Sequence, residues 1–168
     1  MTKMLPIAIT ILHYKDAFLF LKRKNPPYEN LWCLVGGKIK IGEHIPSAAV
    51  REVMEETSAK HVSNYVLKGV VSERLIKPDN DLAGHFLIFV GSAEIDTFEP
   101  NHREGVIERF TLEEIMDMKD SIIASDYEMF MRFVESSPMS LQYHEVELVQ
   151  EKSSYHLNYY RDVTSESQ

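Results

Sequence analysis

The amino-acid sequence predicts an α+β fold in which a mixed β-sheet lies between helices. Apolar runs of strand length recur along the chain, and an amphipathic helical segment near residues 46–57 interrupts them. Two further helical segments follow the last of the central runs. Strands and helices therefore do not alternate regularly, as they would in a doubly wound α/β domain.

Length and composition limit the class of protein. The 168 residues correspond to about one domain. The 18 Lys and Arg against 26 Asp and Glu give a net charge of −8, which argues against a general nucleic-acid-binding surface. The single cysteine, Cys33, excludes an intramolecular disulfide and a multi-cysteine metal site, and it is typical of a reducing compartment. No apolar run has the length of a membrane helix or of a convincing signal peptide, so we expect a cytoplasmic protein without a membrane partner.

The first third of the chain is expected to contain three strands and one helix. The expected elements are strands at 5–13, 17–22 and 31–35, a proline-containing loop at 25–30 and a helix at about 46–57. Pro46 suits the first turn of that helix. We expect the third strand to end at Gly36-Gly37, where the apolar run stops.

The second part of the chain continues the sheet and then turns helical. The expected elements are strands at 62–73, 84–94 and 106–110 and helices at about 112–118 and 121–134. Thr111 and Glu114 have the spacing of a capping box, which predicts the start of the first of these helices.

The tail after Pro138 differs from the rest of the chain. We expect one domain over residues 1–137 and, over 138–168, an extension that is not a separate domain. In this extension, 141–150 and 155–162 flank a polar turn and predict a hairpin. The hairpin is expected to cover a sheet edge or to contact a second subunit in a homodimer, and a mobile tail is the alternative. The last residues, 164–168, are expected to be disordered.

The helix at 46–57 carries acidic side chains on one side. Helical periodicity groups Glu52, Glu55 and Glu56 together, with Arg51 beside them. The opposite side, formed by Val50, Val53, Met54 and Thr57, is expected to face the core.

Two interpretations of the acidic side are open. A solvated face is the simpler one, but such faces usually alternate in charge, whereas Glu52 repels both Glu55 and Glu56 by about 0.2–0.5 kcal/mol per pair. A hard divalent cation would remove that repulsion, because carboxylate oxygens suit Mg²⁺ and Mn²⁺. Arg51 can hold a carboxylate in forked geometry. We therefore favour a metal site.

The spacing around this helix resembles the Nudix box, over residues 37–59. Gly37 is followed after five residues by Glu43, and seven residues later come Arg51-Glu52-Val53, any residue and Glu55-Glu56. Three positions depart from the family pattern. They are Ser58 in place of the closing glycine, Ala59 in place of a bulky aliphatic and Val35 in place of a proline. Serine tolerates a positive φ less well than glycine, so a shifted helix end is expected.

The resemblance implies an α/β/α sandwich that hydrolyses a nucleoside diphosphate-linked compound by attack of water on phosphorus, with Mg²⁺ or Mn²⁺. It implies that the metal is held by Glu52, Glu55 and Glu56, with the Gly37 carbonyl as an additional ligand. Arg51 would orient these glutamates, and Glu43 would be a secondary ligand or a structural partner. Glu55 would act in catalysis as well as in metal binding.

Family members often add a glutamate from a loop and an arginine at a strand end. We favour Glu104 as the loop metal ligand or general base, because Gly105 beside it suits a mobile loop, and we keep Glu108 in reserve. Either side chain can instead be an exposed loop glutamate. Lys22 and Arg23 are expected to bind substrate phosphate, although basic residues at a strand end are often only solvated.

The substrate is expected to be a small-molecule nucleotide. No proline lies at the distance downstream of the box that is associated with ADP-ribose hydrolases. No tyrosine lies at the distance associated with diadenosine polyphosphate hydrolases. A nucleoside triphosphate or a nucleotide sugar is therefore the default. The alternatives are a non-catalytic, nucleotide-sensing Nudix module and an interaction protein with a chance acidic helix.

Overall fold

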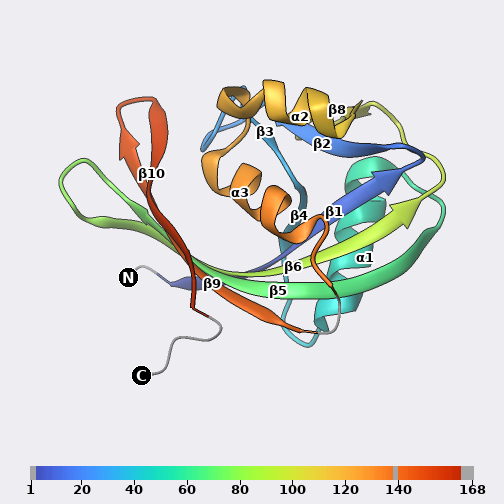
Figure 1. Cartoon of the computed structure of the whole chain (residues 1–168), viewed down its shortest axis with the longest axis horizontal. Helices are drawn as coiled ribbons and strands as arrows, with labels where there is room; N and C mark the ends of the chain where they lie inside the picture. The colour runs from blue at the N-terminus through green and yellow to red at the C-terminus, as the bar shows by residue number, and fades with distance from the viewer. Residues whose placement is uncertain (1–2, 138–139, 164–168) are drawn as a thin grey trace.

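The computed structural model describes residues 3–137 and 140–163 (Figure 1). The strands are β1 (Met4–Tyr14), β2 (Ala17–Arg23), β3 (Trp32–Cys33), β4 (Val35–Lys38), β5 (Val62–Ile76), β6 (Leu82–Ile95), β7 (Asn101–His102), β8 (Gly105–Phe110), β9 (Gln142–Glu151) and β10 (Ser154–Asp162). The helices are α1 (Ile45–Thr57), α2 (Leu112–Asp117), the 3₁₀ turn η1 (Lys119–Ser121) and α3 (Ala124–Phe133). The predicted mixed α+β fold is confirmed.

One mixed sheet contains all the strands. Its order is β10-β9-β5-β6-β1-β2-β8-β7, with β3 beside β2 and β4 beside β1. β1 pairs with β6 in parallel along most of its length. On its other side β1 changes partner, because Ile7–Thr10 pair with β4 and Leu12–Tyr14 pair with β2. The sheet therefore divides between β2 and β4.

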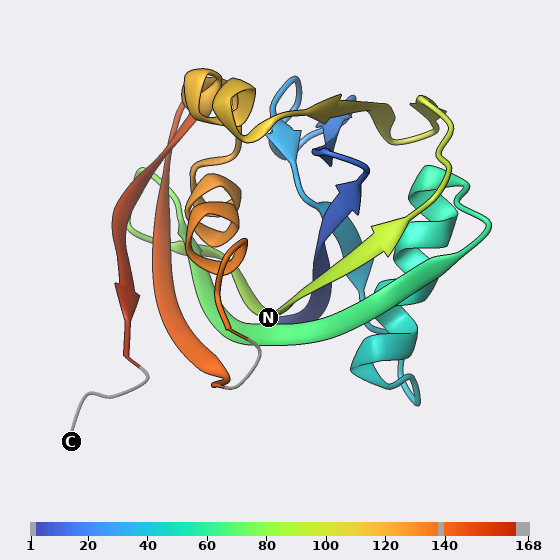
Figure 2. The same ribbon diagram turned by 45° about the vertical axis from the view of Figure 1, so that its right-hand side comes forward.

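Helices α1 and α3 cover opposite faces of this sheet. Ala8 of β1 packs against Ala48 and Ala49 of α1, whereas its neighbour Ile9 packs in the cluster that contains Phe130 of α3. Successive side chains of a strand point to opposite faces. The two helices therefore lie on either side of β1, and Figure 2 shows α3 within the concave side of the curved sheet. This is the predicted sandwich.

Several element boundaries differ from the expectation, and β5 and β6 extend beyond the predicted 62–73 and 84–94. The single strand predicted at 31–35 is divided into β3, which pairs with β2, and β4, which continues through Gly36-Gly37 and pairs antiparallel with β1. The helix predicted at 121–134 is shorter, because the backbone at Ile122 and Ile123 is extended before α3 begins at Ala124. The predicted capping box at α2 is present, with Thr111 and Glu114 each accepting the other's backbone N–H.

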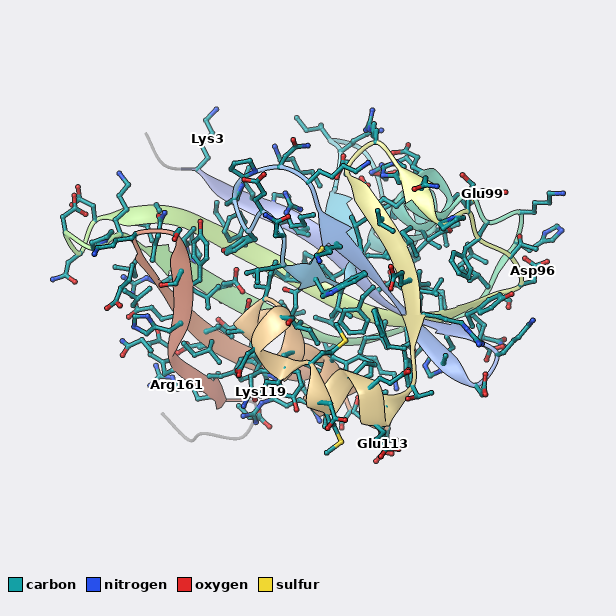
Figure 3. All side chains as sticks on the ribbon, turned by 90° about the horizontal axis from the view of Figure 1, so that it is seen from above. Lys3, Asp96, Glu99, Glu113, Lys119 and Arg161 are labelled. Atoms are coloured by element: carbon teal, nitrogen blue, oxygen red, sulfur yellow. The ribbon has the colours of Figure 1, made fainter. Side chains whose placement is uncertain are left out.

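The C-terminal hairpin is present and extends the sheet. β9 pairs in parallel with β5, and β10 pairs with β9 as the outermost strand. Phe133 of α3 stacks on His144 of β9, with ring centroids 4.7 Å apart. Figure 3 shows Arg161 on this hairpin at one end of the molecule and Asp96 and Glu99 at the other. The expectation of disorder at 164–168 concerns residues outside the described part of the chain, and contact with a second subunit stays a prediction.

Within residues 3–137 and 140–163, the helices are too short or too polar to cross a lipid bilayer.

Candidate active site

A cavity of about 620 Å³ lies on the side of β1 where its partner changes from β4 to β2. Strands β1, β2 and β4, helix α1 and the turn between β7 and β8 all contribute side chains to its wall. The residues from the sequence pattern that line it are Arg23, Gly37, Arg51, Glu52, Glu55, Glu56 and Glu104. The fold thus brings together side chains that are far apart in the sequence.

Helix α1 turns part of its acidic side inward, since Glu56 is buried and Glu52 partly buried, whereas Glu55 is exposed. The buried residues of this helix are Ala48, Ala49, Val53, Glu56 and Thr57. The expected core side is therefore confirmed for Val53 and Thr57 and wrong for Met54, which is 43% exposed, and for Val50, which is only half-buried. The small side chains of Ala48 and Ala49 pack against Ala8 of β1, and Glu56 lies on the same buried side of the helix.

The double glycine explains how carboxylates fit against the sheet. A Cβ on Gly36 would lie 2.2 Å from the backbone oxygen of Ala8, so β4 can pair closely with β1 only without a side chain there. A Cβ on Gly37 would lie 2.6 Å from the carboxylate of Glu52. The Gly36 N–H donates to Oε2 of Glu56 over 3.1 Å. Gly36 therefore lets β4 pair closely with β1 and donates to Glu56, and Gly37 leaves room for the Glu52 carboxylate.

Arg51 is the centre of the acidic network. Its guanidinium donates to both carboxylate oxygens of Glu43, at 2.7 and 2.9 Å. It also donates to Glu52 at 2.5 Å and to Glu55 at 3.3 Å. The hydrogen bond from Arg51 holds the pKa of Glu43 down to about 2. Arg51, which is held by Glu43, is therefore placed to orient Glu52 and Glu55.

The carboxyl of Glu56 has a raised pKa. The side chain is 4% exposed, and burial raises the pKa of its carboxyl to about 8, although the Gly36 N–H opposes this. The negative charges of Glu104 and Glu52 raise the pKa further. Both causes would be relieved by a cation against these oxygens.

The donor set fits a hard divalent cation. Carboxylate oxygens of Glu52, Glu55 and Glu56 and the backbone around Gly37 offer oxygen ligands only, as Mg²⁺ and Mn²⁺ prefer. No three His, Cys, Asp or Glu side chains already converge as a metal site in the part of the chain that the structure describes. Arg51 instead engages Glu52 and Glu55 in ion pairs.

Of the four residues expected to act from the loop and the strand end, two line the cavity and two do not. Glu104 lines the cavity from the turn between β7 and β8, with its side chain 42% exposed, whereas Glu108 is exposed on β8 and does not line it. Arg23 lines the cavity, and its Nε donates to the Pro27 carbonyl over 2.9 Å. Lys22 is exposed and outside the cavity, with its ammonium 5.6 Å from the centre of the Trp32 ring.

Gly105 has a different role from the one expected. It is the first residue of β8 and pairs with Arg23 of β2. A Cβ at Gly105 would lie 1.8 Å from the backbone oxygen of Lys22. The glycine is therefore explained by close strand pairing rather than by a mobile loop.

Comparison with known proteins agrees with this geometry. The model of the NUDIX domain family matches residues 4–133.

The chain belongs to the NUDIX domain family.

Two curated relatives share parts of the sequence. An ADP-ribose pyrophosphatase from Methanocaldococcus jannaschii is 36% identical over 80 residues, which are 48% of this chain and 44% of that protein. A putative 8-oxo-dGTP diphosphatase from Bacillus subtilis is 43% identical over 49 residues, 29% of this chain and 31% of that protein. The matches thus span less than half the length of either relative.

Solved structures share the fold along more of the chain. The MutT protein from Bacillus halodurans superposes with a TM-score of 0.79 at 24% identity, covering 97% of this chain and 100% of that one. A NUDIX hydrolase from Nitrosomonas europaea superposes with a TM-score of 0.65 at 19% identity, covering 89% of this chain and 81% of that one. The coverage by the first structure includes most of the C-terminal extension, which lies beyond the match to the NUDIX domain model.

Ser58 ends α1 where this NUDIX domain departs from the family pattern. Its φ of 58° lies in the left-handed region, and its N–H donates to the Met54 carbonyl. The expected shift of the helix end is therefore wrong, because serine adopts the conformation that glycine would take at lower cost. Thr57 supports the exit, since its hydroxyl donates to the Val53 carbonyl and accepts from the Ala59 N–H.

Some residues that line the cavity were not predicted from the sequence. Among them are Glu73 of β5, Asp126 of α3 and Tyr28 of the proline-containing loop. Burial raises the pKa of Glu73 and of Asp126 to about 7 each. A signal existed for Glu73, because it alternates with Val71 and Leu75, so an acid falls on the buried side of a strand. Tyr28 carries no such periodic signal.

Proposed function

We propose that this NUDIX domain hydrolyses a phosphoanhydride bond in a nucleoside diphosphate-linked compound, with Mg²⁺ or Mn²⁺ as cofactor. The observation that carries the proposal is the single cavity that contains Glu52, Glu55 and Glu56 of α1, Glu104 of the β7–β8 turn and Arg23 of β2. Acidic metal ligands, a separate carboxylate and a cation for phosphate are the groups that such a hydrolysis requires. The names of the curated relatives, a pyrophosphatase and a putative diphosphatase, are consistent with it.

Glu52 and Glu56 would be the main metal ligands, with Glu55 and the Gly37 carbonyl as additional ones. A bound divalent ion neutralises phosphate oxygens and lowers the pKa of a coordinated water. Arg51 orients Glu52 and Glu55 through the hydrogen bonds described above, while Glu43 fixes the guanidinium. This division leaves Arg51 as a positioning residue.

Two further residues would act on the substrate directly. Arg23 would donate hydrogen bonds to a phosphate oxygen, because its guanidinium is the cation of β2 that reaches the cavity. Lys22 was expected to share this role, but its position over Trp32 supports Arg23 alone. Glu104 would accept the proton of the attacking water, since its half-exposed carboxylate lies at the rim beside the acidic cluster.

The substrate is proposed to be a nucleoside triphosphate or a nucleotide sugar. The two curated relatives are named for ADP-ribose, a nucleotide sugar, and for 8-oxo-dGTP, a triphosphate. A screen of both classes with Mg²⁺ or Mn²⁺, read as released phosphate after phosphatase coupling, would identify the substrate. A cytoplasmic location is part of the proposal and is supported by Cys33, a buried thiol rather than a disulfide.

Glu56→Gln tests the proposed function. Glutamine keeps the shape of Glu56 and can accept the Gly36 N–H, but it removes a charged metal ligand. We expect Mg²⁺-dependent phosphate release to fall by at least about a hundredfold while the melting temperature stays at or above that of the wild type. Glu108→Gln is the matched control, because Glu108 is exposed outside the cavity. Unchanged turnover in Glu56→Gln contradicts the proposal, and nucleotide binding without turnover in the wild type supports the sensing module instead.

A further inference from the structure

The cavity has a second polar region, away from the metal-binding glutamates. Oε2 of Glu73 and the hydroxyl of Tyr28 are both buried and lack a hydrogen-bond partner of normal geometry among the described residues, although the Ser125 hydroxyl lies close enough to Glu73 to lower the pKa of its carboxyl. Both residues line the cavity. Buried polar atoms in folded proteins are almost always hydrogen-bonded, because an unpaired one costs free energy. Two such atoms in one cavity indicate groups that a ligand satisfies.

Glu73 is well placed to bind an uncharged polar group. Its side chain is 5% exposed on β5, and Phe86 and Ile88 of the adjacent strand β6 line the same cavity. A carboxyl held among apolar side chains favours its neutral form, and the pKa of about 7 agrees with this. In that form Glu73 offers one O–H donor and one acceptor. Such a pair matches the hydrogen-bonding edge of a nucleobase, while Phe86 and Ile88 offer apolar surface to its ring.

Tyr28 is in contact with the C-terminal hairpin. It lies in the loop between β2 and β3, with φ 66°, in the left-handed region. The ring of Tyr155, on β10, contacts the Tyr28 ring with centroids 4.4 Å apart. Burial is the main cause that raises the pKa of the Tyr28 hydroxyl, and the carboxyls of Glu73 and Asp126, when ionised, raise it further, so these groups lie within electrostatic range of one another. The hairpin lies beyond residues 4–133, the part that matches the NUDIX domain model.

We propose that Tyr155 is a positioning residue that holds Tyr28 against the cavity, where the Tyr28 hydroxyl and the Glu73 carboxyl bind the nucleobase of the substrate. This inference rests on the proposed function for the identity of the ligand as a nucleotide. It gives the C-terminal hairpin a part in substrate selection, in addition to its part in the sheet. The phosphate end of the substrate would lie toward Arg23 and the α1 glutamates, in the same cavity.

Equilibrium binding tests the proposal without requiring turnover. The probes are AMP, GMP, CMP and UMP, which share a phosphate and differ in the base, and inorganic pyrophosphate, which has no base. Each is titrated with Mg²⁺ by calorimetry into the wild-type protein and the variants. Tyr155→Ala is expected to weaken binding of the preferred monophosphate on the order of tenfold, the upper range for one aromatic contact. Binding of pyrophosphate should change by less than about twofold.

Matched variants separate positioning from general damage to the fold. Tyr155→Phe keeps the ring contact with Tyr28 and should bind like the wild type. Tyr159→Ala removes another hairpin tyrosine, whose ring contacts Arg161 and which does not line the cavity, and it should also bind like the wild type. Glu73→Leu reaches the same region from β5. It should change the order of preference among the four bases, because leucine neither donates nor accepts a hydrogen bond, whereas a glutamine amide, like a neutral carboxyl, does both.

Several outcomes would overturn the proposal. They are wild-type affinity for the monophosphates in Tyr155→Ala, an equal loss for monophosphate and pyrophosphate, and an unchanged base preference in Glu73→Leu. A wild type that binds pyrophosphate but none of the monophosphates also overturns it and leaves the proposed hydrolysis standing. Conversely, monophosphate binding that depends on Tyr155 in a protein that releases no phosphate from any substrate would support this site and refute the hydrolysis.

Discussion

Replacing Glu73 by glutamine is expected to change how stability depends on pH. Burial raises the pKa of Glu73 to about 7 in the folded protein, against 4.5 for an ordinary glutamate. The folded state therefore holds the proton more tightly than the unfolded chain between these values. The contribution of Glu73 to stability is complete below about pH 4.5 and is lost as the pH rises through 7. The two pKa values differ by about 2.5, which corresponds to about 3 kcal/mol of unfolding free energy.

Urea denaturation at pH 5 and pH 8 measures this effect. The wild type should lose more unfolding free energy between the two pH values than Glu73→Gln does, by up to about 3 kcal/mol. Asp126, with a pKa also raised to about 7, contributes a pH dependence that both proteins share. Glu99→Gln, at an exposed position, serves as the control and should follow the wild type. Equal pH dependence in the wild type and Glu73→Gln would refute the assignment of a buried, protonated carboxyl.

Three further substitutions test the acidic site and its helix. Ser58→Gly should raise the unfolding free energy by about 0.5–1 kcal/mol, because glycine adopts the left-handed conformation more easily; a melting temperature at or below that of the wild type would contradict this. Gly37→Ala should weaken Mn²⁺ binding by about tenfold or more in calorimetry, since the new methyl would displace the Glu52 carboxylate, and wild-type affinity would argue against that contact. Glu104→Gln should lower turnover by about 10²–10⁴-fold, and comparable loss in Glu108→Gln would make Glu108 the loop carboxylate instead.

Much of the fold was predictable because local patterns agreed with the final packing. The apolar run of β1 is buried over most of its length, and the capping box at Thr111 starts α2 where its spacing indicates. The tyrosine-rich tail forms the predicted hairpin. The spacing from Gly37 to Glu56 also identified the acidic cluster, because those side chains lie on one short segment of the chain.

The remaining features depend on contacts between distant segments. Gly36 and Gly37 lower the strand propensity of β4, yet pairing with β1 and the approach of α1 select glycine at both positions. The parallel pairing of β9 with β5 connects segments separated by α2 and α3, and no local pattern specifies it. Tyr28 lines the cavity from a loop whose contact with Tyr155 joins two segments far apart in the sequence.

Helix α1 shows why the amphipathic pattern indicated the buried side only in part, since Val53 and Thr57 are buried as expected but Val50 and Met54 are not. The pattern assumes that apolar side chains are buried and charged ones are solvated, and Val50 and Met54 were assigned to the core on that basis. A carboxylate can occupy a buried position when a backbone donor and a cation compensate its desolvation. Gly36 provides the donor for Glu56, and the proposed metal provides the charge. Exposed Met54 and buried Glu56 thus both follow from a buried side of α1 that is shifted toward Ala49 and Glu56, and the shift places Glu56 in the wall of the cavity while Glu55 stays exposed.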